Sequence, residues 1–277
     1  MSAKLRLGLI GDNITRSKSP MLHRLAGEIT GLDVSYDRLI PADRGQSFDE
    51  VFDWAAAEGY RGINITYPYK ERVCAHVAVP DPLVRAIGAV NTVVFNSDGP
   101  EGHNTDYTGF VAAYRAARGA QSTGTVCLIG TGGVGKAVAF GLLALHAPVI
   151  RLVDLDAGKA EALAAGLRAA GSESRIEIFT EAAEAARGAD GVINCTPIGM
   201  VGLDGTPLPA AYMSGASWAF DAVYTPVDTV FLTDAGKAGL QVISGYELFF
   251  NQGIDAWHIF TGAPVDAQTL RRNLACS

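Results

Sequence analysis

The chain has 277 residues, of which 48% are hydrophobic and 32 are glycine, a composition typical of a folded globular protein. Its net charge of −7 argues against a nucleic-acid partner, because affinity for nucleic acids comes largely from basic patches. No stretch reaches about 18 uninterrupted apolar residues, and a strand begins almost at once without a signal-peptide hydrophobic region. We therefore expect no membrane contact and a cytoplasmic location.

The cysteines and histidines do not indicate a metal site. The four cysteines show no C-x-x-C pairing, and the five histidines are scattered without the H-x-x-x-H or H-E-x-x-H spacings. We expect buried, reduced thiols and no metal ion.

The first part of the chain alternates short strands with helices. Strands are predicted at 4–11, 34–40, 62–67, 89–95 and in the segment ending at 106, and helices at 19–30, 47–58 and around 84–89. The last two strands are joined by the turn 96–100. This alternation predicts an α/β domain with a mainly parallel sheet covered on both faces.

A helix at 105–119 precedes a second series of the same kind. Strands are predicted at 126–130, 149–154, 176–179, 191–196, 218–224 and 241–244, and helices at 134–145, 157–171 and near 181–188. A last apolar helix at 246–262 lies beyond this sheet, and we expect it to pack back on the first domain.

A glycine motif at the start of this second series predicts a dinucleotide site. Gly130, Gly132 and Gly135 have the spacing G-x-G-x-x-G between an apolar strand and a helix. The glycines permit a tight turn, close approach of a pyrophosphate and close helix–strand packing, and the helix amides receive phosphates. Asp154 ends the next strand, where a ribose-binding acid belongs. We therefore predict a C-terminal Rossmann domain.

If a nicotinamide cofactor is bound, the first domain must hold a substrate near the carboxyl ends of its strands. Oxidation of a secondary alcohol needs a hydride acceptor and a base within about 3 Å of the hydroxyl. The polar candidates at strand ends are Ser17, Ser19, Asn64, Thr66, Lys70, Asn91, Asn104 and Asp106.

These residues lie in segments that resemble one known family over nearly the whole chain. The matching segments, in order, are SKSP, NITYPYK, GAVNT, GHNTD, GTGGVG, NCTPIGM, DAVYTP and the closing helix GYELFFNQGIDAWHIFTG. They resemble the shikimate dehydrogenases, and are most similar to the NAD-dependent quinate/shikimate subclass. The resemblance implies reversible oxidation of shikimate to 3-dehydroshikimate.

The resemblance also implies roles for individual residues. Lys70 and Asp106 match the catalytic pair at the reacting hydroxyl. Ser17 and Ser19 match the hydroxyls that hold the substrate carboxylate, although both also suit helix capping before Pro20. The matches to ligands of the ring hydroxyls are Thr66, Asn91 and Gln252. Tyr224 matches a tyrosine near the substrate, and a packing role is equally compatible. Asn64 is expected to organise its loop.

The implied cofactor contacts all lie in the second half of the chain. They are Gly130, Thr131, Gly132, Gly133, Val134, Gly135, Asp154, Leu155, Thr196, Gly199, Met200, Val223 and Gly245. The corresponding domains are 1–106 for substrate binding and catalysis, 107–243 for the cofactor, and 244–277 for helices returning to the first domain.

One departure from the common family pattern bears on the cofactor. Many members carry N-R-T after the second strand, and their arginine reaches the 2′-phosphate of NADP. This chain has Asp154, Leu155 and Asp156 there. A carboxylate accepts hydrogen bonds from ribose hydroxyls and repels a phosphate, so we expect NAD to be preferred over NADP.

The substrate is less sharply specified. Serine at position 19, where the quinate-using subclass can carry threonine, favours shikimate over quinate. Quinate or another cyclic polyol carboxylate, such as an amino-shikimate, remains an alternative, and so does a non-catalytic ligand sensor. Retention of both Lys70 and Asp106 counts against the sensor. We expect a monomer or homodimer with small-molecule ligands.

Overall fold

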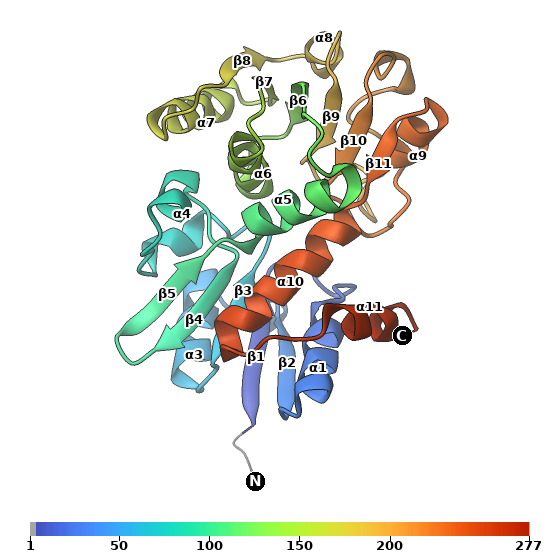
Figure 1. The fold of residues 1–277 in the computed structure, drawn as a ribbon. Helices are drawn as coiled ribbons and strands as arrows, with labels where there is room; N and C mark the ends of the chain where they lie inside the picture. The colour runs from blue at the N-terminus through green and yellow to red at the C-terminus, as the bar shows by residue number, and fades with distance from the viewer. Residues whose placement is uncertain (1–3, 277) are drawn as a thin grey trace. The chain divides into compact units, whose positions relative to one another are not determined.

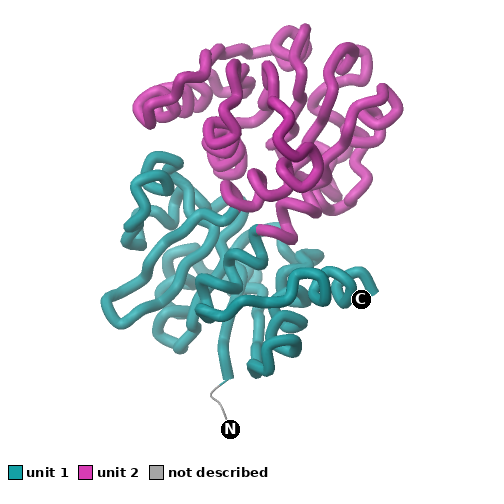
Figure 2. The backbone as a smooth tube through the Cα atoms, in the orientation of Figure 1, with its two compact units in different colours: residues 1–105, 252–277 teal, residues 106–251 magenta. Residues whose placement is uncertain are grey.

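The computed structural model describes residues 4–276. The chain divides into two compact units, one formed by residues 1–105 with 252–277 and the other by residues 106–251 (Figure 2). Each unit contains one sheet and its own helices (Figure 1). The expected boundaries at 106/107 and 243/244 differ from these unit boundaries by one and eight residues, and the functional division stays a prediction.

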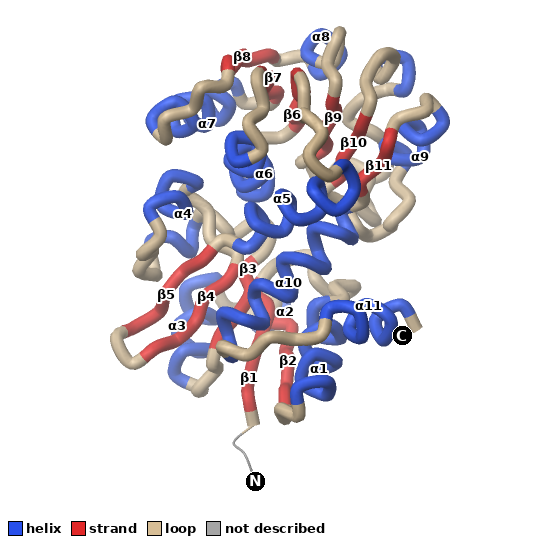
Figure 3. Tube along the Cα trace, viewed as in Figure 1, coloured by secondary structure: helices blue, strands red, loops and turns tan. Residues whose placement is uncertain are grey.

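The first unit has a five-stranded mixed sheet in the order β2-β1-β3-β4-β5 (Figure 3). Its strands are β1 (Leu5–Ile10), β2 (Val34–Leu39), β3 (Gly62–Ile65), β4 (Thr92–Asn96) and β5 (Gly99–His103). β1, β2 and β3 run parallel, whereas β4 and β5 form an antiparallel hairpin, because only a short turn joins them. The α/β class is confirmed, with the parallel part confined to the first three strands.

The helices of this unit follow local sequence signals. They are α1 (Ser19–Thr30), α2 (Pro41–Arg44), α3 (Phe48–Ala57), the 3₁₀ turn η1 (Arg72–Ala75), α4 (Pro82–Ile87) and α11 (Ala267–Ala275). The start of α3 is a capping box, in which Ser47 and Glu50 satisfy each other's backbone amides. α3 buries Phe48, Val51, Phe52 and Ala55 in one core with β3 residues such as Ile63.

The second unit has a six-stranded, all-parallel sheet in the order β11-β10-β9-β6-β7-β8. The strands are β6 (Thr125–Ile129), β7 (Val149–Val153), β8 (Arg175–Phe179), β9 (Gly191–Asn194), β10 (Trp218–Asp221) and β11 (Gln241–Ile243). Numbered within the unit, the order is 3-2-1-4-5-6, which is that of the doubly wound dinucleotide fold. Successive strands are added on one side of β6 up to β8 and on its other side from β9 onward, and ligands bind at the point where this strand order reverses in such folds.

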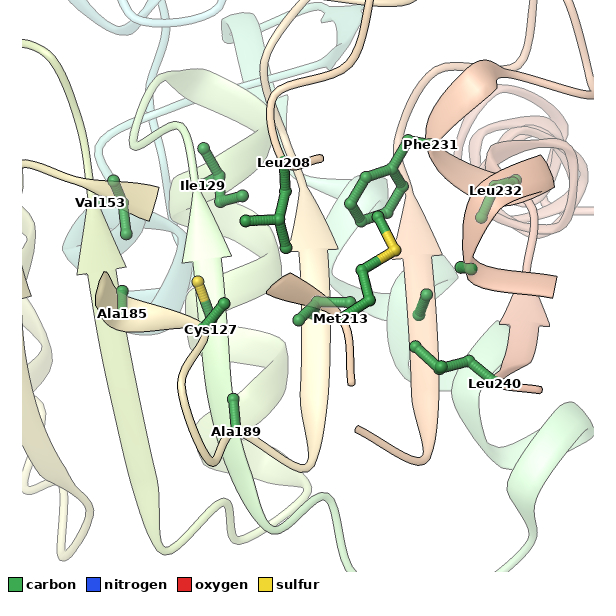
Figure 4. Close-up of a cluster of buried hydrophobic side chains, with 14 residues drawn as sticks. Cys127, Ile129, Val153, Ala185, Ala189, Leu208, Met213, Phe231, Leu232 and Leu240 are labelled. Atoms are coloured by element: carbon green, nitrogen blue, oxygen red, sulfur yellow. The ribbon is translucent and has the colours of Figure 1, made fainter. Parts of the chain in front are cut away.

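Helices and an apolar core complete this unit. The helices are α5 (Thr105–Arg118), α6 (Gly133–Ala144), α7 (Ala157–Ala169), α8 (Ala182–Ala185), η2 (Ala210–Tyr212), α9 (Val230–Lys237) and α10 (Gly245–Thr261), of which α5 begins and α10 ends in the first unit. Cys127 and Ile129 of β6 belong to one buried cluster with Leu208, Met213 and Phe231 (Figure 4).

The carboxyl-terminal part of α10 packs in the first unit. Gly253 lies against Leu22 of α1, and a Cβ atom there would come within 2.7 Å of the leucine side chain. Further along α10, the rings of Trp257 and Phe260 contact the buried His23 of α1. The expected return of the last long helix to the first domain is confirmed. No helix within residues 4–276 is long and apolar enough to cross a membrane.

Candidate active site

The glycine loop of the second unit joins β6 to α6. Gly130 has a φ of +95°, and a Cβ atom there would lie 2.8 Å from the carbonyl carbon of Cys195. A Cβ atom at Gly135 would overlap the carbonyl oxygen of Gly130. Both positions therefore require glycine, one for backbone conformation and one for packing.

Gly132 faces open space and precedes the first turn of α6. A Cβ atom at this position would meet nothing within 4 Å, and no side chain caps the helix. The first amides of a helix lack intrahelical acceptors and carry the positive end of its dipole. The loop thus leaves room and donors for an anionic group beside Gly132, Gly133 and Val134.

Asp154 connects this loop to the end of β7. Its Oδ2 accepts hydrogen bonds from the backbone amide of Thr131 at 2.8 Å and from the Thr131 hydroxyl at 2.7 Å. Its Oδ1 accepts one from the Asp156 amide at 3.0 Å. Burial alone would raise the pKa of Asp154, but these hydrogen bonds and Lys159 hold the pKa below its usual value. The carboxylate is therefore ionised and fixed next to the glycine loop.

The two residues that follow Asp154 face solvent. The Leu155 side chain is 99% exposed, and the Asp156 carboxylate caps α7 by accepting from the Gly158 amide. No guanidinium or ammonium group occupies positions 154–156 at this strand end.

The loop after β9 contains the next expected cofactor contacts. Thr196 is held by Asn194, whose Oδ1 accepts from the Thr196 amide and hydroxyl. Gly199 has a φ of +98°, and its amide donates to the carbonyl of Leu203 at 2.7 Å. Met200 is half-buried within the same loop.

The loop after β10 carries Val223 and Tyr224. Val223 is buried, and its backbone lies so close to Gly245 that a Cβ there would come within 2.6 Å of the Val223 carbonyl oxygen. The ring of Tyr224 stacks on Phe249 with centroids 4.7 Å apart. This contact shows that Tyr224 packs within its own unit, and a role beside substrate stays a prediction.

These features of the second unit fit a dinucleotide. The open cradle at Gly132, the uncapped amides of α6 and the carboxylate of Asp154 suit a pyrophosphate and the adjacent ribose. No group of three or more His, Cys, Asp or Glu side chains in the described chain is arranged to hold a metal ion.

The predicted substrate residues of the first unit begin at a serine turn before α1. The Ser17 hydroxyl donates to the Ser19 hydroxyl at 3.1 Å and accepts from the Ser19 amide. Arg38 of β2 donates to the Ser17 carbonyl oxygen at 2.7 Å. The two serines are therefore together, and a cation holds their backbone in place.

A second cluster joins Asn91, Thr105 and Gln252. Asn91 is 3% exposed, and its side-chain amide donates to the Thr105 hydroxyl at 3.0 Å. That hydroxyl donates in turn to Gln252 Oε1 at 3.3 Å. Thr105 was not among the predicted site residues, although it belongs to the quoted GHNTD segment. That segment was the signal that could have identified it.

Thr66 and Lys70 lie in the loop after β3. The Thr66 amide donates to the carbonyl of Ile10 at 2.9 Å, and the Lys70 carbonyl accepts from the Val90 amide at 2.8 Å. Lys70 itself is half-buried. Asp106 is 3% exposed in the first turn of α5 and is the first residue of the second unit, whereas Lys70 belongs to the first.

Asn64 takes part in a series of hydrogen bonds between buried side chains of the same unit. Its Oδ1 accepts from the Tyr36 hydroxyl at 2.8 Å, and its side-chain amide donates to the Thr92 hydroxyl at 3.0 Å. The Thr92 hydroxyl donates to Asn91 Oδ1 at 3.1 Å. Asn64 thus connects the central strands of the sheet to Asn91, and a role in organising its loop stays a prediction.

Comparisons with known proteins agree with this architecture. A family model described as the shikimate dehydrogenase substrate binding domain matches residues 9–93. The quinate/shikimate dehydrogenase (NAD(+)) of Corynebacterium efficiens is 37% identical over 271 residues, covering 96% of this chain and 95% of that protein. The shikimate dehydrogenase (NADP(+)) of Pseudarthrobacter chlorophenolicus is also 37% identical, over 270 residues, covering 96% of this chain and 92% of that protein.

A solved structure has the same fold over the full length. Quinate dehydrogenase from Corynebacterium glutamicum in complex with NAD matches with a TM-score of 0.89 and 32% sequence identity, covering 99% of both chains. Sequence, fold and the order of the motifs therefore agree, and the chain belongs to the shikimate dehydrogenase family.

Proposed function

We propose that this chain catalyses the reversible oxidation of shikimate to 3-dehydroshikimate and prefers NAD to NADP. The observation that carries the cofactor preference is the carboxylate of Asp154, which is held beside the glycine loop by Thr131. Overall similarity does not decide this point, because relatives named for NAD(+) and for NADP(+) are both 37% identical.

The glycine loop and Asp154 would hold the dinucleotide. The pyrophosphate would lie beside Gly132 at the uncapped start of α6, and Asp154 would accept from the adenosine ribose hydroxyls. A 2′-phosphate at the same place would meet this ionised carboxylate and find no guanidinium at 154–156. The expected lining of the nicotinamide ring is Gly199 and Met200, and Thr196 and Val223 would be further contacts of the cofactor.

The first unit would bind the substrate. Ser17 and Ser19 would donate to its carboxylate, and the remaining donors and acceptors for its hydroxyls would be Thr66, Asn91 and Gln252. The hydrogen bonds among Asn91, Thr105 and Gln252 support this assignment, since they fix the side chains before a ligand arrives. A site of this kind rejects analogues that lack a hydroxyl, because buried polar groups would lose their partners.

Lys70 and Asp106 would handle the proton. Lys70 would accept the proton of the reacting hydroxyl, and Asp106 would hold that hydroxyl in position. When bound, the nicotinamide ring supplies the acceptor for the hydride that leaves the carbon bearing this hydroxyl. In the reverse direction, Lys70 would return the proton to the developing alkoxide.

Quinate is the second candidate substrate. It is favoured by the full-length match to a quinate dehydrogenase that was solved with NAD. Ser19 favours shikimate, because threonine can occupy this position in the quinate-using subclass. We also propose a cytoplasmic location and a monomeric or homodimeric state. Neither bears on the choice between shikimate and quinate.

Initial rates for shikimate and quinate, each with NAD and with NADP, test the proposal. We expect the highest kcat/KM for shikimate with NAD. Faster oxidation of quinate would move the chain to the second candidate, and a higher kcat/KM with NADP would contradict the role of Asp154. Absence of any oxidation while NAD still binds would refute the substrate assignment alone.

A further inference from the structure

A buried carboxylate of the second unit has no part in the function described so far. Asp221 ends β10 and is 0% exposed. It accepts hydrogen bonds from the Asn194 side-chain amide at 2.9 Å, the Val223 amide at 2.9 Å and the Thr229 hydroxyl at 2.6 Å. All three donors are neutral. Burial outweighs these hydrogen bonds and raises the pKa of Asp221 to about 6.

Asn194 extends this network into the loop after β9. Its side-chain amide donates to Asp221 and also to the carbonyl of Ile198 at 3.0 Å. Its Oδ1 accepts from the amide and the hydroxyl of Thr196 at 2.9 and 2.7 Å. A single fully buried side chain therefore fixes the turn that leads to Gly199 and Met200.

The other side of the network fixes the loop after β10. Thr229 caps α9 by accepting from the Leu232 amide at 3.2 Å, and it donates to Asp221 at the same time. Val223 donates its amide to the same carboxylate. The loop 222–229 is thus attached at both ends to Asp221.

Two loops are consequently joined through one pair of side chains. Asn194 and Asp221 are 27 residues apart in sequence, at the ends of neighbouring parallel strands. Loop 195–200 carries Gly199 and Met200, which are expected to line the nicotinamide ring, and loop 222–229 carries Val223, another expected cofactor contact. Burying a carboxylate among neutral donors is unfavourable for folding, so a purely apolar contact would serve stability better.

We propose that Asn194 and Asp221 are positioning residues, which hold loops 195–200 and 222–229 in the arrangement that receives the nicotinamide half of the cofactor. This inference rests on the proposed function, because it assumes a nicotinamide dinucleotide at this unit. The adenosine half would be bound by the glycine loop and Asp154. Cys195 and Thr196 pack against Gly130, but no hydrogen bond described above joins Asn194 or Asp221 to Gly132 or to Asp154.

Binding of the two halves of the cofactor can be measured separately by comparing NADH with ADP-ribose, which lacks the nicotinamide ring. We would measure the Kd of each ligand by calorimetry for the full chain and for Asn194→Asp. This substitution replaces the amide by a carboxyl group, which removes the hydrogen bond to Ile198 and places a second acid beside Asp221. We expect the Kd for NADH to rise at least fivefold and the Kd for ADP-ribose to change less than twofold.

The conservative variant Asp221→Asn should keep the hydrogen-bond network intact. The asparagine carbonyl oxygen can accept from both Asn194 and Val223, and its amide can donate to the Thr229 oxygen. We expect its ratio of NADH to ADP-ribose affinity to lie within threefold of wild type.

Two further variants control for a general loss of stability. Asp190→Asn changes a carboxylate at the opposite end of β9, where it accepts from the Thr125 amide, and should leave both Kd values unchanged. If melting shows that Asn194→Asp does not fold, Thr229→Val removes only one hydroxyl and should give the same selective loss in smaller degree.

The outcomes distinguish this inference from the proposed function. Equal weakening of NADH and ADP-ribose, or no weakening of either, would refute the positioning role while leaving the function intact. A wild-type chain that bound neither probe would refute the proposed function and this inference together.

Discussion

The two candidate ligand clusters are built in different ways. In the second unit, the glycine loop presents backbone amides, and its special positions lie within six consecutive residues, Gly130 to Gly135. In the first unit, the cluster consists of side chains, and the hydrogen-bonded residues Thr105 and Gln252 are 147 positions apart. A backbone site follows from local spacing, whereas a side-chain site depends on how the sheet and α10 bring distant residues together.

This difference implies separable functions. Substitutions in the first unit should change substrate binding and proton transfer, and substitutions at the strand ends of the second unit should change cofactor binding. The following variants test that separation, from the largest expected effect to the smallest.

Lys70→Ala should have the largest effect and should act on chemistry alone. A positioned acid–base group contributes roughly 10²–10⁴-fold to a rate, so we expect kcat for shikimate to fall by about 10³-fold. Calorimetry should give an unchanged Kd for NAD. Lys237→Ala, an exposed change on α9, is the control. A loss below tenfold would exclude Lys70 as the proton acceptor.

Asp154→Ala should act on the cofactor alone. Hydrogen bonds to charged groups contribute about 1.5–3 kcal/mol, so kcat/KM with NAD should fall by roughly 10²-fold. The value with NADP should not fall, because a negative charge that opposes the 2′-phosphate is removed. Steady-state rates with each cofactor measure this, with Glu161→Gln on the exposed face of α7 as control. Equal losses with both cofactors would show that Asp154 only supports the loop through Thr131.

Thr105→Val should raise the KM for shikimate by about tenfold. The change leaves Asn91 and Gln252 without the hydroxyl between them, and an unsatisfied buried polar group costs about 1–3 kcal/mol. Thr105→Ser retains the hydroxyl and should stay near wild type. The Kd for NAD should not change in either variant. A shift in that Kd would contradict the separation of the two clusters.

The last prediction expects no change in activity at neutral pH and concerns stability at acid pH. His23 is 1% exposed, its ring stacks on Tyr36 at 4.8 Å, and burial lowers its pKa to about 3, although Asn64 acts in the opposite direction. Because the folded pKa lies below the unfolded value of about 6.5, the unfolded chain binds the extra proton between these values. Stability is therefore retained above pH 6.5 and lost on acidification, by about 1 kcal/mol per pH unit below about 6.

Melting temperatures between pH 7 and pH 4.5 measure this loss. His23→Phe keeps an aromatic ring against Tyr36 but cannot be protonated, so its melting temperature should fall less steeply with pH than that of wild type. The exposed His258→Gln should leave the slope unchanged. Identical slopes for wild type and His23→Phe would show that His23 does not contribute.

Much of the fold was predictable from the sequence because its signals are local. The glycine spacing, the apolar strands and the turn at 96–100 each specify a neighbouring element, and the structure contains them. Helix α9 was not predicted, because its eight residues include a glycine and span only about two turns, too few to establish a helical period. α2, with four residues, is too short to give a periodic pattern.

The candidate site was predictable in part. The serine turn and the glycine loop each occupy one short segment, and their internal contacts follow from that segment. The links from Thr105 to Gln252 and from Asn194 to Asp221 depend on strand order and on the path of α10, which no local spacing specifies. The sequence therefore indicates many of the polar residues of the site, but it does not indicate which of them bond to one another.

A competition experiment tests the central claim most directly. Wild-type protein would be given shikimate with NAD and NADP at equal concentrations, and the NADH and NADPH formed would be separated by chromatography. Their initial ratio equals the ratio of the two kcat/KM values. Our account predicts that NADH predominates over NADPH. It also predicts that the amount of 3-dehydroshikimate equals the sum of the NADH and NADPH formed. Predominance of NADPH, or reduced cofactor without that product, would contradict it.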